Sequence, residues 1–233
     1  KKTTTASSNT AVGTSALACN TTGATNVALG MQALKANTTG EHNTAVGHNS
    51  LLANLTANQN VAVGNYTLDA STAGPNTAVG YCALSNVTGG AGNVAIGDLA
   101  GAQAAMINVT SENNRAVFGN TSVTNAYVKV AFTVTSDARD KTNFGTVPHG
   151  LDFVNKLEPV SFKFKKSRDN DTPHGDMRYG FKAQDIMALE GDNPVIIDNE
   201  FEDALKYKGE HLVPVLVNAI KELTKRIKDL EDK

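Results

Sequence analysis

The chain lacks most of the features that would place it at a nucleic acid, a metal ion or a membrane. Among its 233 residues there is no Trp, the net charge is −2, and Cys19 and Cys82 are the only cysteines. Two cysteines so far apart form neither a disulfide framework nor a metal site, and no apolar run could span a bilayer. A charge near zero does not suit a nucleic-acid or anionic-lipid surface. We therefore expect no cofactor, no metal, no nucleic-acid partner and no membrane insertion.

An initiator Met and an apolar signal-peptide core are also missing. The chain opens with Lys1-Lys2-Thr3 and continues in polar residues. From this opening we expect a fragment of a longer protein.

Charge is scarce in the first 135 residues, which carry only five basic and four acidic side chains. From Ser136 onward the chain holds 16 of its 21 basic and 19 of its 23 acidic residues. Such a step in composition marks two regions built on different principles.

The uncharged region repeats one pentapeptide, Asn-x-Ala-aliphatic-Gly. Six regular copies follow one another at spacings of 17, 17, 17, 16 and 17 residues, and they begin at Asn9, Asn26, Asn43, Asn60, Asn76 and Asn93. A degenerate seventh copy spans Asn114–Gly119. In the first five copies a leucine follows the glycine by four residues, at Leu17, Leu34, Leu51, Leu68 and Leu84. The period is too short for a two-helix repeat and predicts stacked β-coils.

Each part of the pentapeptide suits such a coil. An alanine beside a larger aliphatic residue fits a short strand with a tightly packed inner face. The glycine permits a turn with positive φ or a close approach of two backbones. The asparagine can bond neighbouring backbone, and stacked asparagines can form ladders.

Residues 9–101 resemble the head repeat of trimeric autotransporter adhesins, a left-handed β-roll that also occurs in phage tail fibres. The resemblance rests on the six regular copies of the pentapeptide. It implies that three chains pack around a threefold axis, and that the aliphatic positions fill both each chain's own core and the shared one. The alternative is a monomeric β-solenoid of another family.

A neck at residues 120–135 follows the repeats. From Tyr127 onward its β-branched and aromatic residues alternate in a way that predicts a strand. Directly after the neck comes the hexapeptide Ser136-Asp137-Ala138-Arg139-Asp140-Lys141.

Ser136 and Lys141 are the candidate catalytic pair. A serine hydroxyl becomes a good nucleophile only when a base takes its proton. A lysine amine can be that base when burial lowers its pKa, and Ser–Lys pairs are one variant of the serine-nucleophile arrangement. Almost any protein contains a Ser and a Lys five residues apart, so the hexapeptide by itself is better explained as a polar turn or a helix start.

Three later blocks give the pair its context, namely Gly150–Phe164, Arg178–Asp185 and Leu212–Leu223. With the hexapeptide they resemble, in the same order, the intramolecular chaperone domain of phage tail spikes and fibres, which is known from endosialidases and classed as a serine peptidase family. The resemblance covers residues 136–230. The chain departs from the family pattern at Asp140, where an apolar residue is common, and at Asp185, where Glu is usual.

The resemblance implies a single cut between Thr135 and Ser136. Ser136 Oγ would attack the carbonyl of Thr135, and Lys141 would act as general base and then return the proton to the leaving amine. Water would hydrolyse the resulting ester. Asp137 and Arg139 match the family motif and would hold the turn in shape or place charge near the oxyanion. A plain salt-bridge role for Arg139 stays open.

The hydrophobic spacing in this second region predicts its remaining elements. We expect a short helix over 151–157, strands at 160–164 and 179–183, an exposed hairpin or loop at 165–177, a helix at 184–189 and a short strand at 195–197.

A long helix over about 212–231 is predicted to end the chain, with Pro214 in its first turn. Its apolar residues follow the 3-4 spacing of a heptad seam, at Val213, Leu216, Ile220, Leu223, Ile227 and Leu230. Charged residues, Glu222 and Arg226 among them, are expected to cover the outside. We expect a parallel trimeric bundle. A dimer, or a single amphipathic helix packed on its own domain, is the alternative.

The predicted fold is therefore an all-β repeat region at 1–119, formed as a trimeric left-handed parallel β-roll. The neck at 120–135 leads to an α+β chaperone domain at 136–233 that ends in a coiled-coil helix. The predicted function is that of a homotrimeric phage tail fibre or spike fragment, whose chaperone drives trimerisation and folding and then releases itself by autoproteolysis. As an enzyme it would be a single-turnover autocatalytic serine peptidase with no other substrate.

The resemblance places the mature part in the virion tail fibre, with a host cell-surface receptor or glycan as its partner, and the chaperone in the host cytoplasm until its release. One alternative is a bacterial or phage surface adhesin with a non-cleaving structural trimerisation module. Another is a membrane-tethered transcription factor that uses the same module, although no DNA-binding domain or transmembrane helix is evident. The third is a chaperone copy that no longer cuts.

Overall fold

The computed structural model describes residues 5–232 apart from 104–105, 130, 133 and 135. The chain divides into two compact units, Lys1–Val123 and Thr124–Lys233. The division falls inside the segment predicted as the neck.

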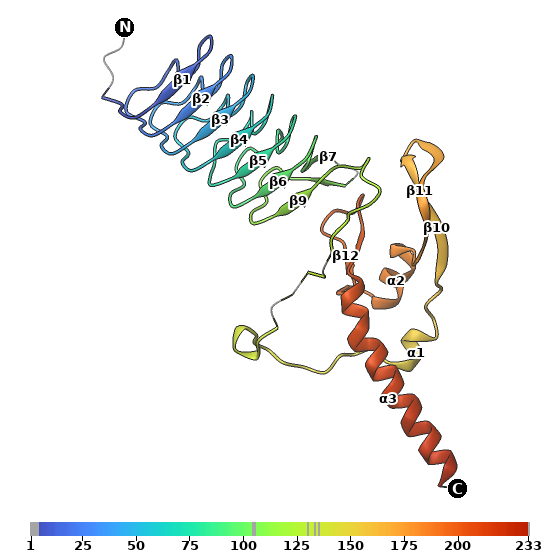
Figure 1. Ribbon diagram of the computed structural model, residues 1–233. Coiled ribbons are helices and arrows are strands. Elements are labelled where there is room, and N and C mark those ends of the chain that lie inside the picture. The colour runs from blue at the N-terminus through green and yellow to red at the C-terminus, as the bar shows by residue number, and fades with distance from the viewer. Residues whose placement is uncertain (1–4, 104–105, 130, 133, 135, 233) are drawn as a thin grey trace. The chain divides into compact units, whose positions relative to one another are not determined.

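The first unit is a parallel β-solenoid (Figure 1). Its seven-stranded sheet has the order β1-β2-β3-β4-β5-β6-β9, with strands β1 (Thr10–Val12), β2 (Val27–Leu29), β3 (Thr44–Val46), β4 (Val61–Val63), β5 (Thr77–Val79), β6 (Val94–Ile96) and β9 (Ala116–Phe118). The register places each pentapeptide on the next, so that Ala28 pairs with Ala45 and Ala45 with Ala62. The predicted solenoid of stacked coils is thereby confirmed.

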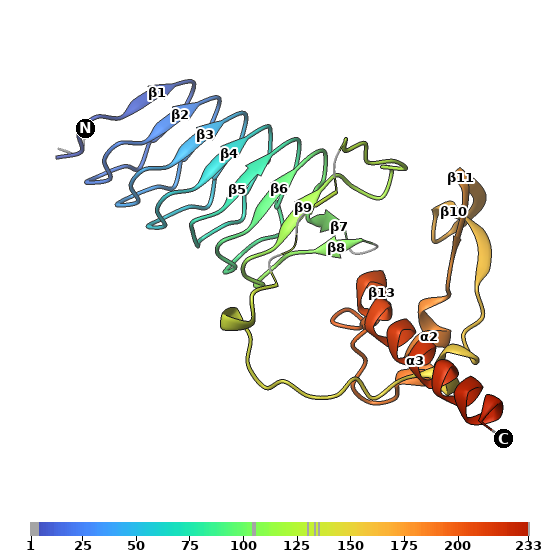
Figure 2. The same ribbon diagram turned by 60° about the horizontal axis from the view of Figure 1, so that its bottom comes forward.

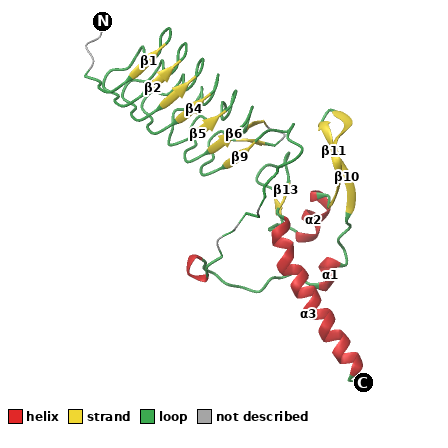
Figure 3. Ribbon diagram, viewed as in Figure 1, coloured by secondary structure: helices red, strands yellow, loops and turns green. Residues whose placement is uncertain are grey.

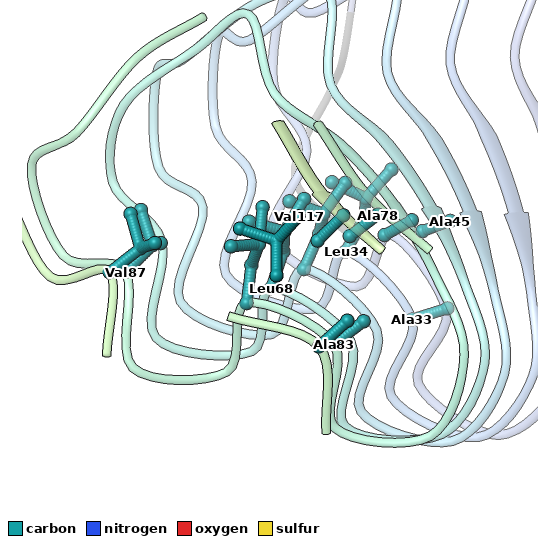
Figure 4. Packing of buried hydrophobic residues seen from close by; sticks show 14 of the residues in the cluster. Ala33, Leu34, Ala45, Leu68, Ala78, Ala83, Val87 and Val117 are labelled. Carbon is teal, nitrogen blue, oxygen red and sulfur yellow. The ribbon is translucent and has the colours of Figure 1, made fainter. Parts of the chain in front are cut away.

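Alanines and leucines form the solenoid core (Figure 4). The strand alanines Ala45 and Ala78 are fully buried, as are Leu34 and Leu68 from the turn that follows each strand. Leu34 and Leu68 have positive φ angles of 49° and 51°. The left-handed conformation costs about 1–2 kcal/mol per residue, whereas burying a leucine stabilises the fold by about 1.5–3 kcal/mol. Burial therefore offsets the backbone strain at these leucines, although each coil also holds other non-glycine residues with positive φ, such as Gln32 and Tyr66.

The larger aliphatic residue of each pentapeptide lies on the outer face of the sheet. Val12, Leu29 and Ile96 are 57%, 47% and 45% exposed. Successive strand residues point to opposite faces, and the neighbouring alanine occupies the inner face. The prediction that these aliphatic residues fill the chain's own core is therefore wrong. They form an apolar row along the outer face of the solenoid instead, exposed at most coils and half-buried at Val46 and Val63.

Two asparagine ladders connect the coils, as predicted. In the first, the backbone N–H of Asn43 donates to Asn26 Oδ1 at 2.9 Å, and that of Asn60 donates to Asn43 Oδ1 at 3.0 Å. In the second, Asn54 Nδ2 donates to Asn37 Oδ1 at 2.9 Å. These buried hydrogen bonds hold each coil on the next, although Asn54 Oδ1 and Asn60 Nδ2 find no hydrogen-bond partner among the described residues.

The last coil differs from the others (Figure 2). A small antiparallel hairpin, β7 (Ala102–Gln103) and β8 (Ile107–Asn108), lies between β6 and β9 in sequence. In β9 the inward position belongs to Val117, which pairs with Ala95 and is 3% exposed. The degenerate seventh repeat thus still closes the sheet.

The second unit is a small α+β domain (Figure 3). Its elements are the 3-10 turn η1 (Ala138–Asp140), α1 (Leu151–Val154), β10 (Val160–Ser167), β11 (Asn170–Gly180), α2 (Ala183–Glu190), β12 (Ile197–Asp198), β13 (Lys206–Tyr207), the 3-10 turn η2 (Gly209–His211) and α3 (Leu212–Glu231). The predicted helices are present, although α1 ends at Val154 rather than at 157. The segment predicted as an exposed hairpin or loop at 165–177 is mostly strand, because β10 and β11 pair antiparallel almost to their turn. Strand β11 ends at Gly180 rather than at 183, and β12 lies at 197–198 rather than at 195–197. The common core of this unit consists of Phe153, Ile186, Ile196, Ile197, Leu212 and Val215.

The neck does not form the predicted strand. Among the described residues of 120–135 there is no β-structure, and Tyr127, Phe132 and Val134 are 92%, 83% and 71% exposed. A strand needs a neighbour for its backbone hydrogen bonds, and the described part of this chain does not provide one there. The strand prediction is therefore wrong for the single chain.

Candidate active site

The candidate site is a tight turn at the start of the charged region. Asp137 caps η1, because its Oδ1 accepts the backbone N–H of Arg139 at 2.9 Å. The backbone N–H of Asp140 donates to Asp137 O at 3.1 Å, and that of Lys141 donates to Ala138 O at 3.2 Å. These bonds reverse the chain between Ser136 and Lys141.

The turn brings the two predicted catalytic residues into contact. Lys141 Nζ donates a hydrogen bond to Ser136 Oγ across 2.6 Å, which is the separation expected of a nucleophile and its base. Both residues are exposed in the single chain. The predicted scissile bond also involves Thr135, which lies outside the described residues.

Asp137 and Arg139 form a bidentate ion pair within the turn. Arg139 Nε lies 3.1 Å from each oxygen of the Asp137 carboxylate, and Arg139 Nη2 lies 2.6 Å from Oδ2. The hydrogen bonds from Arg139 lower the pKa of Asp137, and the same pairing raises the pKa of Arg139. The salt-bridge role left open for Arg139 is therefore the one seen in the turn.

The predicted seam of α3 is exposed along its whole length. Relative exposures are 56%, 39%, 64%, 47%, 48% and 70% for Val213, Leu216, Ile220, Leu223, Ile227 and Leu230. The same helix buries Leu212, Val215 and Ala219 against its own unit. One face of α3 thus packs on the domain, while the heptad face stays exposed.

Sequence reasoning missed a set of polar contacts on α3. Glu222 Oε2 accepts the backbone N–H of Leu151 at 2.9 Å, and Arg226 Nη2 lies 3.7 Å from Asp152 Oδ1. Both charged residues were expected to cover the outside of the helix. Both are exposed, as expected, but each also continues the 3-4 spacing of the buried face that begins at Leu212, which brings it to α1. That spacing was the available signal.

A row of aromatic side chains follows successive coils of the solenoid. The ring of Tyr66 meets those of His48 and Tyr81 edge to face, with centroids 5.0 and 6.1 Å apart. A hydrogen bond with Cys82 raises the pKa of Tyr81, and burial raises the pKa of the Cys82 thiol. Such ring contacts add to the cohesion between coils.

Metal and membrane sites were also sought in the part of the chain that the structure describes. There, no group of three or more His, Cys, Asp or Glu side chains is arranged to hold a metal ion. No helix among those residues has both the length and the apolar character needed to cross a bilayer.

Comparison with known families agrees with this geometry. Residues 136–195 match the model of a family described as the chaperone of endosialidase, whose members are self-cleaving intramolecular chaperones. The match starts at Ser136, the predicted nucleophile, and ends before α3. Comparisons with curated proteins and with solved structures give no match. The chain therefore combines a parallel β-solenoid with a second unit that is similar, over residues 136–195, to the chaperone of endosialidase family.

Proposed function

We propose that this chain is part of a homotrimeric phage tail fibre or tail spike, and that its C-terminal module cuts itself off after folding the fibre. The observation that carries the proposal is the 2.6 Å hydrogen bond from Lys141 to Ser136. This bond lies at the first residue of the family match.

The cut is an acyl shift followed by hydrolysis. Lys141, as the free amine, takes the hydroxyl proton while Ser136 Oγ bonds to the carbonyl carbon of Thr135. The C–N bond then breaks, and the Ser136 nitrogen receives the proton from the Lys141 ammonium. Thr135 is left as an ester of Ser136 Oγ. Water cleaves this ester, which releases the Thr135 carboxylate and restores the serine hydroxyl.

Two exposed apolar surfaces support a trimer of identical chains. One is the aliphatic row on the outer face of the solenoid sheet, which runs from Val12 to Phe118. The other is the heptad seam of α3, whose 3-4 spacing suits a parallel bundle. Contiguous apolar surfaces of this kind mark interaction sites on soluble proteins. Each surface repeats regularly along its own element, as an interface between identical chains requires.

Assembly would also complete the catalytic pair. A lysine acts as a base when burial favours its neutral form, yet Lys141 is exposed in the single chain. Neighbouring chains of the trimer would bury it, together with the exposed neck residues Tyr127 and Phe132. Cutting would then occur only in an assembled trimer and would serve as a folding checkpoint.

The cut has a physical purpose in this proposal. Three long β-structured chains must align before their coils stack, and such long-range closure is slow. A module that trimerises first sets the register and raises the local concentration of the other chains. Once the module has gone, the mature fibre cannot unfold through the same nucleus, and its stability becomes kinetic. The mature part, carried on the virion, would then bind a receptor or glycan of the host cell.

The test is expression of the full chain beside Ser136→Ala and Lys141→Ala, with denaturing gels and intact mass. Wild type should give two fragments divided between Thr135 and Ser136, while both variants should stay whole and still form trimers by native mass spectrometry. Lys166→Ala, which changes an exposed lysine of β10, should cut like wild type. A wild-type trimer that stays intact would refute the proposed cut.

A further inference from the structure

Helix α3 carries a second stripe of side chains beside its seam. Leu212, Val215 and Ala219 are 5%, 2% and 5% exposed and pack against the domain. The next two positions at the same 3-4 spacing are Glu222 and Arg226, so the apolar stripe continues as a polar one. The polar part faces the segment that leads from the candidate dyad into α1.

Glu222 caps α1 from a distant part of the chain. Gly150 stands at the N-cap of α1 and supplies no side-chain hydrogen bond. Glu222 Oε2 accepts the Leu151 N–H at 2.9 Å in its place, which satisfies one of the unpaired donors at a helix start. A Cβ at Gly150 would lie 2.1 Å from Glu222 Oε1. The glycine therefore makes room for the carboxylate.

Asn218 holds the same segment one helical turn earlier. Its Nδ2 lies 3.3 Å from Val147 O and 3.3 Å from His149 O. The ring of His149 in turn stacks on that of Phe153 at 4.3 Å, and Phe153 belongs to the buried core. We name Asn218 and Glu222 together the clasp. It fixes residues 147–151 to the helix that carries the seam.

The clasp is the first fixed point after the candidate dyad. Residues 142–148 are exposed and form neither helix nor strand. The turn with Ser136 and Lys141 is therefore connected to the domain core through this short irregular segment, which ends at the clasp.

We propose that Asn218 and Glu222 are positioning residues for the self-cleavage reaction, and that they couple the helix bundle to the cut. The inference rests on the proposed function. When three seams meet, the clasp fixes the end of the short segment that carries each Ser136–Lys141 turn, and so limits how far the turn can lie from the bundle. A shift of about 1 Å in a reacting group can cost about a hundredfold in rate, so loss of the clasp slows the cut without removing either catalytic side chain.

The experiment follows newly made full-length chains in cell-free translation, by pulse and chase. Trimer formation is measured by native electrophoresis and cutting by denaturing electrophoresis, so that the cutting rate is expressed per folded trimer. We expect Glu222→Ala to slow this rate at least tenfold. Glu222→Gln should retain most of the rate, because its amide oxygen can still accept the Leu151 N–H. Lys221→Ala changes the exposed neighbour and should behave like wild type.

Each other outcome counts against the inference. A wild-type cutting rate per trimer in Glu222→Ala overturns it. Any fall in total cut product would then only match the fall in trimer, which indicates a purely structural role. Failure of Glu222→Gln to rescue overturns the hydrogen-bond basis. If Glu222→Ala forms no trimer, Asn218→Ala decides by the same criteria. A wild-type trimer that never cuts refutes the proposed function and the inference together, whereas a cutting wild type with unaffected variants refutes the inference alone.

Discussion

Leu212 and Val213 are neighbours in α3 but lie in different surroundings, with Leu212 5% and Val213 56% exposed. Successive helical residues point about 100° apart, so one packs on the domain and the other opens the heptad seam. The helix therefore packs on its own domain through one face and leaves an adjacent apolar face exposed. Changes on one face should affect assembly, and changes on the other should affect the fold of the single chain.

The seam can be tested at Ile220, which is 64% exposed although its neighbour Ala219 is buried. In a Ser136→Ala background, which keeps the module attached, Ile220→Asp should convert trimer to monomer. Burying an unpaired carboxylate costs about 3–5 kcal/mol, and a trimer would bury three of them. Sedimentation equilibrium measures the change, and circular dichroism should show the helix content preserved. The matched control is Lys225→Asp on the outside of the helix, and a trimer that survives Ile220→Asp would rule out the seam.

The asparagine ladder predicts that removal of a buried amide lowers thermal stability strongly, whereas removal of an exposed amide lowers it little. Asn43 is fully buried, and its side chain accepts the Asn60 N–H and donates to Ala57 O at 2.8 Å. Asn43→Ala leaves the buried Asn60 N–H without its partner, which costs about 1–3 kcal/mol. Ala57 O loses one of two donors and keeps Asn54 Nδ2 at 3.1 Å. We expect a clear fall in the midpoint of thermal unfolding followed by β-sheet circular dichroism.

The control for this prediction is Asn58, whose Oδ1 also accepts a backbone N–H, that of Glu41 at 2.7 Å, but at an exposed position. Water can replace that bond, so Asn58→Ala should leave the midpoint nearly unchanged. Equal effects at Asn43 and Asn58 would show that burial of the ladder is not what stabilises the coils.

The pentapeptide glycines predict a steric test. Gly47 has φ +131°, and a Cβ there would lie 2.4 Å from Gly64 O in the next coil. Gly47→Ala should therefore separate two coils, lower the yield of folded chain and raise susceptibility to limited proteolysis within the repeats. Gly89 has no atom within 4 Å of its would-be Cβ, and Gly89→Ala should fold normally. Normal folding of Gly47→Ala would contradict the close stacking.

The Asp137–Arg139 pair predicts a pH dependence of the turn. Because Arg139 lowers the pKa of Asp137, the ion pair is complete above the usual range for an Asp carboxyl. It is lost only as the pH falls through the lowered value. Carbon NMR of labelled Asp side chains should show this low inflection in Ser136→Ala. Arg139→Ala should raise the inflection toward the ordinary range, though not fully, because the backbone N–H of residue 139 still donates to Asp137. An inflection that does not move would exclude the ion pair as the main cause.

Local features of the sequence predicted much of the fold. The repeat of about 17 residues indicated stacked coils, because each coil needs the next to bury its alanine and leucine. The heptad spacing from Val213 to Leu230 likewise predicted α3 within its observed bounds. Both patterns are periodic and short in range, and the backbone geometry of strand and helix translates them directly into faces.

The sequence did not determine the distance between Ser136 Oγ and Lys141 Nζ. Five residues can span an extended distance or a hydrogen bond, and the capped turn at Asp137 settled it at 2.6 Å. The neck shows the opposite case. From Tyr127 onward its residues alternate as in a strand. A strand also needs a neighbouring strand for its backbone hydrogen bonds, and the alternation does not show whether one is present.

The sequence by itself thus determined the coils, the long helix and the hexapeptide that carries Ser136 and Lys141. Tertiary structure decided which apolar residues of each coil face inward, because alanine and valine are both apolar and only packing against the turn leucines distinguishes them. It also decided the role of Glu222, which meets Leu151 across 71 residues of chain. Contacts of that range arise from how the elements pack. The 3-4 spacing of the helix could place Glu222 on the buried face, but it could not identify Leu151 as the partner.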